Sequence, residues 1–268
     1  MCYPILMIPA KKSLGQNFLH SMGAVHAMVE ASRVTKEDIV LEIGPGKGVL
    51  TESLLKTGAQ VICVEKDDRM IPHLSERFGK ELTGGQLKLI HGDILEISPK
   101  DLGLLANKYK IVANIPYYIT GELIQKFLET DIQPSLMTLM VQKEVARRIV
   151  AKDEKQSILS LSVQVYGTPR YVQTVSAGSF NPVPSVDSAI LLIDTISNNF
   201  ATKNEQETFF KLIKSGFAHK RKKLIRNLET IAEKTTLEKA FSDLQFSLDT
   251  RAEDLDLKQW KTLAQKLV

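Results

Sequence analysis

The feature that most restricts the fold is the alternation of short apolar runs with segments of helical period over the first 196 residues. Apolar runs bounded by Gly, Pro or charged residues are typical of buried strands, and the amphipathic segments between them are typical of helices that cover a sheet. Strands are expected at 39–44, 60–65, 87–93, 110–115, 136–142, 170–176 and 188–196. Helices are expected near 47–57, 67–78, 120–130, 143–151 and 157–166. The pattern predicts an α/β fold with a seven-stranded, mainly parallel sheet.

The rest of the chain follows a different pattern. After the polar segment ISNNFATKN, only helical periods occur, near 205–217, 220–232, 237–243 and 257–267. The charge divides at the same place, because the first 196 residues are neutral and the last 72 hold 14 basic against 10 acidic side chains, which is the whole net charge of +4. We therefore predict one domain over 1–196 and a small all-α domain over 197–268.

The composition excludes several classes of protein. With 43% hydrophobic and 25% charged residues the chain has an ordinary globular composition, and it contains no apolar run of the roughly 18 residues that a membrane span needs. Cys2 and Cys63 are too few for a disulfide framework or a metal-ligand cluster. We expect a cytoplasmic protein that holds no metal and does not cross a membrane.

A glycine-rich loop follows the first predicted strand. VLEIGPGKGVL places Gly44, Gly46 and Gly48 where the chain turns from strand to helix, and Pro45 removes one backbone donor. The spacing is G-x-G-x-G, not the G-x-G-x-x-G of dinucleotide sites, so it favours a smaller ligand than a dinucleotide. Taken alone, the loop also fits an ordinary strand-to-helix turn.

Two acids follow the next strands. Glu65 stands 21 residues beyond Gly44, close to the offset at which a carboxylate binds the hydroxyl pair of a ribose in such sheets. Asp93, in HGDIL, is placed to accept a hydrogen bond from an exocyclic amine. Taken alone, Glu65 also fits a solvated acid at a strand end. Because both share one carboxyl edge of the sheet with the glycine loop, together they predict a nucleoside-containing ligand.

The fourth strand runs into VANIPYYIT, the most informative segment of the chain. Asn114 offers a carbonyl oxygen, and Pro116 fixes its own φ and biases Ile115 toward an extended conformation, so that backbone carbonyls can point to one place. Tyr117 supplies an aromatic face. These groups fit the exocyclic amine of a base, because accepting its hydrogens favours the pyramidal geometry in which its lone pair attacks. Taken alone, the segment equally fits a turn with a buried tyrosine.

Together these motifs resemble the class I S-adenosylmethionine-dependent methyltransferases of the adenine-N6 type. The closer resemblance is to the KsgA/RsmA family of small-subunit rRNA adenine dimethyltransferases. It rests on segments spread in order over nearly the whole chain: KKSLGQNFL at 11–19, NIPYYIT at 114–120, MVQKEVARRIV at 140–150, FNPVPSVDSA at 180–189 and FAHKRKKLIRNL at 217–228. The resemblance implies a class I, Rossmann-like catalytic domain and a helical domain that binds RNA.

The resemblance also implies roles for single residues. The residues implied to bind S-adenosylmethionine are Asn17 and Leu19 in the N-terminal arm, Gly44 and Gly46 in the loop, Glu65 at the ribose, Asp93 at the adenine amine, and Asn114. Asn114 would lie between the donor methyl and the acceptor nitrogen, with Ile115 and Pro116 beside it. Tyr117 and Phe180 would stack on opposite faces of the target base, flipped out of its own stack.

A cationic segment lies in the helical part. Residues 211–226, KLIKSGFAHKRKKLIR, carry seven Lys or Arg and no acid. A charge run is usually only a solvated face, but beside a base-modifying site it favours salt-dependent binding of phosphates. The predicted RNA contacts are Lys220, Arg221, Lys222, Lys223 and Arg226, with Arg147 and Arg148 extending the basic surface.

The resemblance implies an enzyme that dimethylates N6 of two adjacent adenines near the 3′ end of 16S rRNA, as a monomer that acts on the small ribosomal subunit. One alternative is an Erm-type 23S rRNA dimethyltransferase, which shares the N-I-P-[FY] and F-x-P-x-P-x-V motifs. KRKKLIRNL and the second tyrosine of NIPYY favour the first reading. The other alternative is a non-catalytic nucleic-acid-binding factor on the same scaffold, against which the intact cofactor and acceptor motifs argue.

Overall fold

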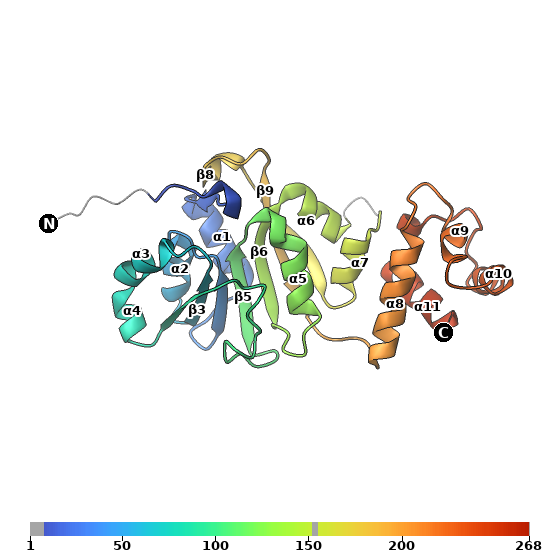
Figure 1. Ribbon diagram of the computed structural model, residues 1–268, viewed down its shortest axis with the longest axis horizontal. Coiled ribbons are helices and arrows are strands. Elements are labelled where there is room, and N and C mark those ends of the chain that lie inside the picture. Colours follow the sequence, from blue (N-terminus) through green and yellow to red (C-terminus); the bar gives the residue numbers. More distant parts are fainter. Residues whose placement is uncertain (1–7, 152–154, 268) are drawn as a thin grey trace. The chain divides into compact units, whose positions relative to one another are not determined.

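The structure is a computed structural model that describes residues 8–151 and 155–267 (Figure 1). These residues form two compact units. The first comprises the chain up to Ala146 together with Thr168–Ile196, and the second comprises Arg147–Gly167 and the chain from Ser197 onward.

The second unit takes in a segment that the sequence pattern assigned to the first domain. Residues 147–167 belong to the second unit because they form hydrogen bonds with residues of the helical part. The Gln206 side chain donates to the Tyr166 hydroxyl at 2.8 Å, and the Gln156 backbone N–H donates to the Glu253 carbonyl at 2.9 Å. An amphipathic helix alone does not reveal which of two cores its apolar face joins.

A seven-stranded sheet forms the centre of the first unit, in the order β4-β3-β2-β5-β6-β9-β7. The strands from β4 to β6 are parallel, and β9 runs antiparallel to both of its neighbours. Their bounds are β2 Ile39–Ile43, β3 Gln60–Glu65, β4 Leu87–His91, β5 Tyr109–Asn114, β6 Leu136–Gln142, β7 Thr168–Val175 and β9 Ser188–Asp194. The predicted seven-stranded, mainly parallel sheet is confirmed.

Helices cover both faces of this sheet. Their bounds are α1 Met22–Ser32, α2 Val49–Leu55, α3 Met70–Arg77, α4 Gly79–Thr83 and α5 Thr120–Leu128. Helix α6, Lys143–Val150, follows β6 and includes the boundary between the two units. Helix α1, which the sequence pattern did not predict, packs against β5, β6 and β9 and buries Val25 and Met28 completely. Figure 1 shows α1 and α5 on opposite faces of the sheet.

A second, two-stranded sheet joins segments that lie far apart in the sequence. Strand β1, Phe18–Leu19, pairs antiparallel with β8, Phe180–Asn181. Strands of two residues are too short to show a period of two, so the sequence did not predict them. The pairing fixes the N-terminal arm beside the carboxyl edge of the main sheet.

The second unit is helical. Its helices are α7 Ile158–Gln164, α8 Lys203–Gly216, α9 Leu224–Leu228, α10 Lys234–Asp243 and α11 Leu257–Lys266. Phe209 and Trp260 are fully buried in its core, and the Phe217 ring stacks on Trp260 at 5.7 Å between centroids. No helix among the described residues is long and apolar enough to cross a membrane.

The helix predicted over 220–232 is wrong at both ends, because α9 covers only Leu224–Leu228 and residues 229–232 form turns. Residues 217–223 form turns between α8 and α9, where the Asn227 side chain donates to the Gly216 and His219 carbonyls. Four consecutive cations at 220–223 disfavour a helix, because like charges three and four residues apart repel each other on its surface. Four of the seven cations of this segment, at 220–223, therefore lie in a loop, and the other three lie in α8 and α9.

Candidate cofactor and acceptor site

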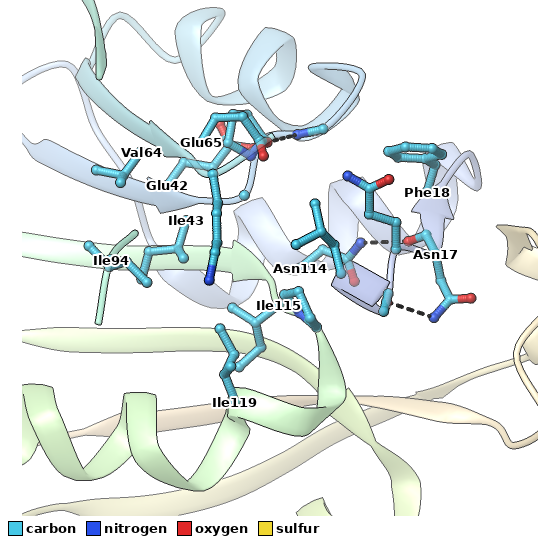
Figure 2. Close-up of a pocket in the computed structure, with 18 of the residues that line it drawn as sticks. Asn17, Phe18, Glu42, Ile43, Val64, Glu65, Ile94, Asn114, Ile115 and Ile119 are labelled. Carbon is cyan, nitrogen blue, oxygen red and sulfur yellow. Dashed lines mark hydrogen bonds between the residues drawn. The ribbon is translucent and has the colours of Figure 1, made fainter. Parts of the chain in front are cut away.

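A cavity lies in the first unit at the carboxyl ends of β2, β3 and β5 (Figure 2). The N-terminal arm, the glycine loop and the segments that follow β3, β4 and β5 line it. Every residue predicted to bind the cofactor is among the lining residues, and so are Ile115, Pro116 and Tyr117. Parallel strands end at the same edge of the sheet, and this is why residues from 17 to 117 meet here.

The backbone of the glycine loop has a conformation that residues other than glycine adopt only with strain. Gly44 and Gly46 have φ values of 66° and 55°. A Cβ at Gly44 would have no atom within 4 Å, whereas a Cβ at Gly46 would lie 3.1 Å from the Phe18 ring. The loop therefore leaves room for a ligand at Gly44 and fits closely under the arm at Gly46.

Glu65 ends strand β3 and is 5% exposed. Its Oε2 accepts the Gly46 N–H at 3.1 Å, and its Oε1 accepts the Asp67 N–H at 2.8 Å (Figure 2 shows the first bond). A carboxylate has about four lone-pair sites, so each oxygen keeps one for a ribose hydroxyl. The two bonds fix the carboxylate for that purpose.

Glu42 is a second buried acid on this cavity, 1% exposed and next to the last residue of β2. Burial raises the pKa of Glu42 to about 7, and it also raises the pKa values of Glu65 and of the Cys63 thiol. The Cys63 thiol donates to Glu42 Oε2 at 3.3 Å. The sequence analysis gave Glu42 no role, although an acid within the apolar run VLEI was a signal of it.

Replacing Glu42 with Gln should remove a pH dependence of stability. Since its pKa is about 7 in the folded state and 4.5 ordinarily, the folded protein keeps a proton that the unfolded chain releases between these values. The free energy of unfolding therefore falls as pH rises through this window, by up to about 3 kcal/mol. Urea denaturation of E42Q should match wild type near pH 4.5 and exceed it at pH 8. The exposed Glu76→Gln is the control, and equal pH slopes for E42Q and wild type would contradict the assignment.

Asp93 lies beyond β4 and carries an ion pair that the sequence did not reveal. Its Oδ2 accepts the Lys66 ammonium at 2.5 Å, and its Oδ1 accepts the Leu95 N–H at 2.9 Å. Burial raises the pKa of Asp93, but these two hydrogen bonds outweigh it and hold the pKa below its usual value. The carboxylate is thus ionised at neutral pH, the state that accepts an amine.

Asn114 is the last residue of strand β5, and a hydrogen bond to the N-terminal arm holds its side-chain amide. Its Nδ2 donates to the Asn17 carbonyl at 3.2 Å (Figure 2). If the Asn114 amide were flipped, its oxygen would face the carbonyl oxygen of Asn17 and this hydrogen bond would be lost. The bond therefore fixes Oδ1 as the atom of the amide that can accept from a ligand. No described residue donates to Asn114 Oδ1, which leaves this oxygen available to a ligand amine.

A hydrogen bond to a residue of the main sheet holds the Tyr117 ring in place. Its hydroxyl and the Ser188 Oγ lie 2.7 Å apart, and Ser188 is fully buried at the start of β9. Burial raises the pKa of the Tyr117 hydroxyl, so the ring is neutral at physiological pH. Tyr118, which the sequence analysis did not single out as a site residue, also lines the cavity and is 61% exposed.

Phe180 is the one predicted acceptor residue that the structure does not bring to the cavity. It is 1% exposed and packs in the core with Leu19 and Met28. The pairing of β8 with β1 turns this ring inward, and the sequence could not show that pairing. The structure thus gives Phe180 a place in the core, and its stacking on a target base stays a prediction.

The comparison with protein families decides the class of the enzyme. Residues 7–268 match the family model described as "Ribosomal RNA adenine dimethylase". The chain belongs to this family. It is an S-adenosylmethionine-dependent methyltransferase of ribosomal RNA adenine, as the motifs implied.

Relatives in bacteria agree with the family match. The chain is 41% identical over 258 residues to "Ribosomal RNA small subunit methyltransferase A" of Dehalococcoides mccartyi strain BAV1, covering 96% of this chain and 88% of that protein. It is 39% identical over 269 residues to the protein of the same name from Lactobacillus johnsonii, covering 96% and 90%.

Two solved structures of RNA methyltransferases share the fold. A dimethyladenosine transferase from Plasmodium falciparum has a TM-score of 0.78 and 27% identity, covering 92% of this chain and 95% of its own. The 23S rRNA methyltransferase ErmE has a TM-score of 0.77 and 24% identity, covering 94% and 99%. The second likeness concerns the fold alone.

Within the described residues, no group of three His, Cys, Asp or Glu is placed to hold a metal ion.

Proposed function

We propose that this enzyme dimethylates N6 of two adjacent adenines near the 3′ end of 16S rRNA within the small ribosomal subunit. The observation that carries the chemistry is the Asn114 amide. Its NH₂ group donates to the Asn17 carbonyl, which leaves its oxygen available in the cavity that Tyr117 also lines. The choice of subunit is supported by the names of the bacterial relatives, which are small-subunit methyltransferases.

The cavity fits S-adenosylmethionine, which supplies an electrophilic methyl group on a sulfonium. Gly44 leaves open space, Glu65 offers two fixed oxygens to a ribose, and Asp93 is an ionised acceptor for an adenine amine. Asn17 and Leu19 close the cavity from the arm. These are the groups that the three parts of the cofactor require.

Asn114 and Tyr117 act on the acceptor base. We assign Asn114 Oδ1 and a backbone carbonyl of the Ile115–Pro116 segment to the two hydrogens of the target amine, and the Tyr117 ring to one face of the base. Base-aromatic stacking is worth about 1–3 kcal/mol per base, so a ring fixed by Ser188 helps to hold the unstacked adenine. Catalysis then depends on positioning and acceptor oxygens rather than on a strong base.

The cationic loop between α8 and α9 is the proposed contact with RNA phosphates. Lys220, Arg221 and Lys222 are exposed and form no ion pair with any described acid. Lys223 pairs with Asp249, and Arg226 pairs with Glu229 at 3.0 Å. Arg147 and Arg148 are exposed on α6 in the same unit. The three unpaired cations should contribute most, because no described protein carboxylate neutralises them.

The triple variant K220A/R221A/K222A should bind small subunits about tenfold or more weakly at 0.1 M salt. Each phosphate contact releases counterions, so the slope of log affinity against log salt should fall by up to about 3. Filter binding over a salt series measures both quantities, and calorimetry should show unchanged cofactor affinity. The matched control is K234A/K239A/K258A, which removes the same charge from exposed positions outside the loop. Equal losses in the two variants would contradict a specific contact.

The function is tested with labelled cofactor and, in separate reactions, undermethylated small and large subunits. We expect two dimethyladenines near the 3′ end of 16S rRNA. Label in the large subunit alone would support the Erm-type alternative, and cofactor binding without label in either subunit would contradict the proposed reaction. No cofactor binding at all would support a non-catalytic factor.

We further propose that the enzyme acts as a monomer in the cytoplasm, where ribosomal subunits are assembled in bacteria. All the residues assigned to the cofactor and acceptor come from one chain. Light scattering at micromolar concentration should therefore give the mass of a single chain, 29.9 kDa. A dimer mass would contradict the proposal.

A further inference from the structure

Gln16 connects the N-terminal arm to the body of the first unit. Its Oε1 accepts the backbone N–H of Lys11 at 2.7 Å, and its Nε2 donates to Asp67 Oδ2 at 2.7 Å. The Gln16 side chain thus links two parts of the arm and connects the arm to a residue 51 positions away in the sequence. Gln16 lines the cofactor cavity together with the next residues of the arm, Asn17 and Phe18, whereas Asp67 lies outside it.

Asp67 is a fixed anchor for this bond. Its side chain is fully buried, and Arg69 donates to both carboxylate oxygens, at 2.9 Å and 2.6 Å. The Arg69 side chain holds the pKa of Asp67 well below its usual range, so the acceptor is charged. A hydrogen bond to a charged acceptor is about twice as strong as a neutral one. The Asp67 backbone N–H also donates to Glu65, the acid assigned to the ribose.

The arm also determines the orientation of the acceptor amide. The carbonyl of Asn17, the residue after Gln16, accepts Asn114 Nδ2 at 3.2 Å. That bond is near the upper limit for an N–H···O hydrogen bond. A small outward movement of the arm would break it, and the amide could then present its NH₂ group to the target amine instead of its oxygen.

We infer that Gln16 and Asp67 form a latch that holds the arm in place and so keeps Asn114 Oδ1 toward the acceptor. They are positioning residues, because neither is assigned a contact with the cofactor or the base. The latch links the ribose end of the cavity at Glu65 to the acceptor end at Asn114. This inference rests on the proposed role of Asn114, but its first test does not require RNA.

The test uses Gln16→Leu, which keeps the bulk of the side chain and removes both hydrogen bonds. Hydrogen exchange of the free protein should show the arm, residues 11–19, exchanging roughly tenfold faster than in wild type, as the loss of about 1.4 kcal/mol of bonding predicts. The control is Ser13→Ala, because Ser13 is exposed on the same arm and its side chain forms no hydrogen bond with a described residue. Unchanged exchange in Q16L would overturn the latch whatever the enzyme methylates.

Steady-state kinetics then distinguish a loss of positioning at the acceptor from a general loss of structure. With small subunits, Q16L should lower kcat about tenfold and leave the KM for subunits within twofold. Asp67→Ala should do the same, and the double variant should be no worse than the worse single one, since both substitutions remove the same bond between Gln16 and Asp67. Additive losses, or a kcat equal to wild type in Q16L with a mobile arm, would overturn the inference. If wild type methylates no subunit, the proposed function fails and the exchange experiment still decides whether the latch exists.

Discussion

Asn114→Ala should lower kcat for methyl transfer to small subunits by roughly 10²- to 10³-fold, the loss typical when one preorganised polar group at a reacting centre is removed. The acceptor amine would lose the amide oxygen that favours its reactive geometry. Stability should change little, because Asn114 lies at the end of β5 and donates a single hydrogen bond to a described residue, the Asn17 carbonyl. Cofactor affinity in calorimetry should stay within a few-fold of wild type.

Asn114→Asp is the informative companion to this variant. Aspartate keeps an acceptor oxygen but cannot donate to the Asn17 carbonyl, so its kcat should lie between those of N114A and wild type. Single-turnover assays with labelled cofactor measure the chemical step directly. Near-normal methyl transfer by N114A would show that the proposed mechanism is wrong.

Phe180→Ala should lower the free energy of unfolding by about 3–5 kcal/mol, the usual cost of truncating a fully buried phenylalanine. The ring is 1% exposed and packs with Leu19 and Met28, so the variant leaves a cavity beneath the β1–β8 pair. Urea denaturation at constant pH measures this loss. Ala substitution at Val183, a 66% exposed residue in the loop after β8, is the control and should cost little.

Phe180→Leu distinguishes the core from a stacking role. Leucine fills most of the space, so a core residue predicts nearly wild-type kcat and KM at a temperature where the protein is folded. A ring that stacked on the base would predict a loss of about 1–3 kcal/mol in transition-state binding, or roughly 5- to 150-fold in kcat/KM. A stable F180L protein with such a loss would restore the role that the sequence motif implied.

The sequence predicted the catalytic half well because its signals are local. A strand buried on both faces is mostly apolar, as LMTLMVQ in β6 is apart from Thr138 and Gln142, and it needs no knowledge of its neighbours to be recognised. Helix α1 was missed because its first residues, MGAVHAM, are weakly amphipathic. The cations at 220–223 were wrongly placed at the start of a helix, because the apolar residues that follow them in LIRNL have a helical period.

What the sequence by itself determined was the class of fold and the edge of the sheet where a ligand binds. Motifs at strand ends suffice for that, because all parallel strands end on one side. Only the tertiary structure decided how the arm meets this edge. The inward turn of Phe180, the bond from Gln16 to Asp67 and the orientation of Asn114 by Asn17 all join residues at least 51 positions apart or depend on such a pairing. Hydrogen bonds over such separations depend on packing geometry, and no local pattern of residues records them.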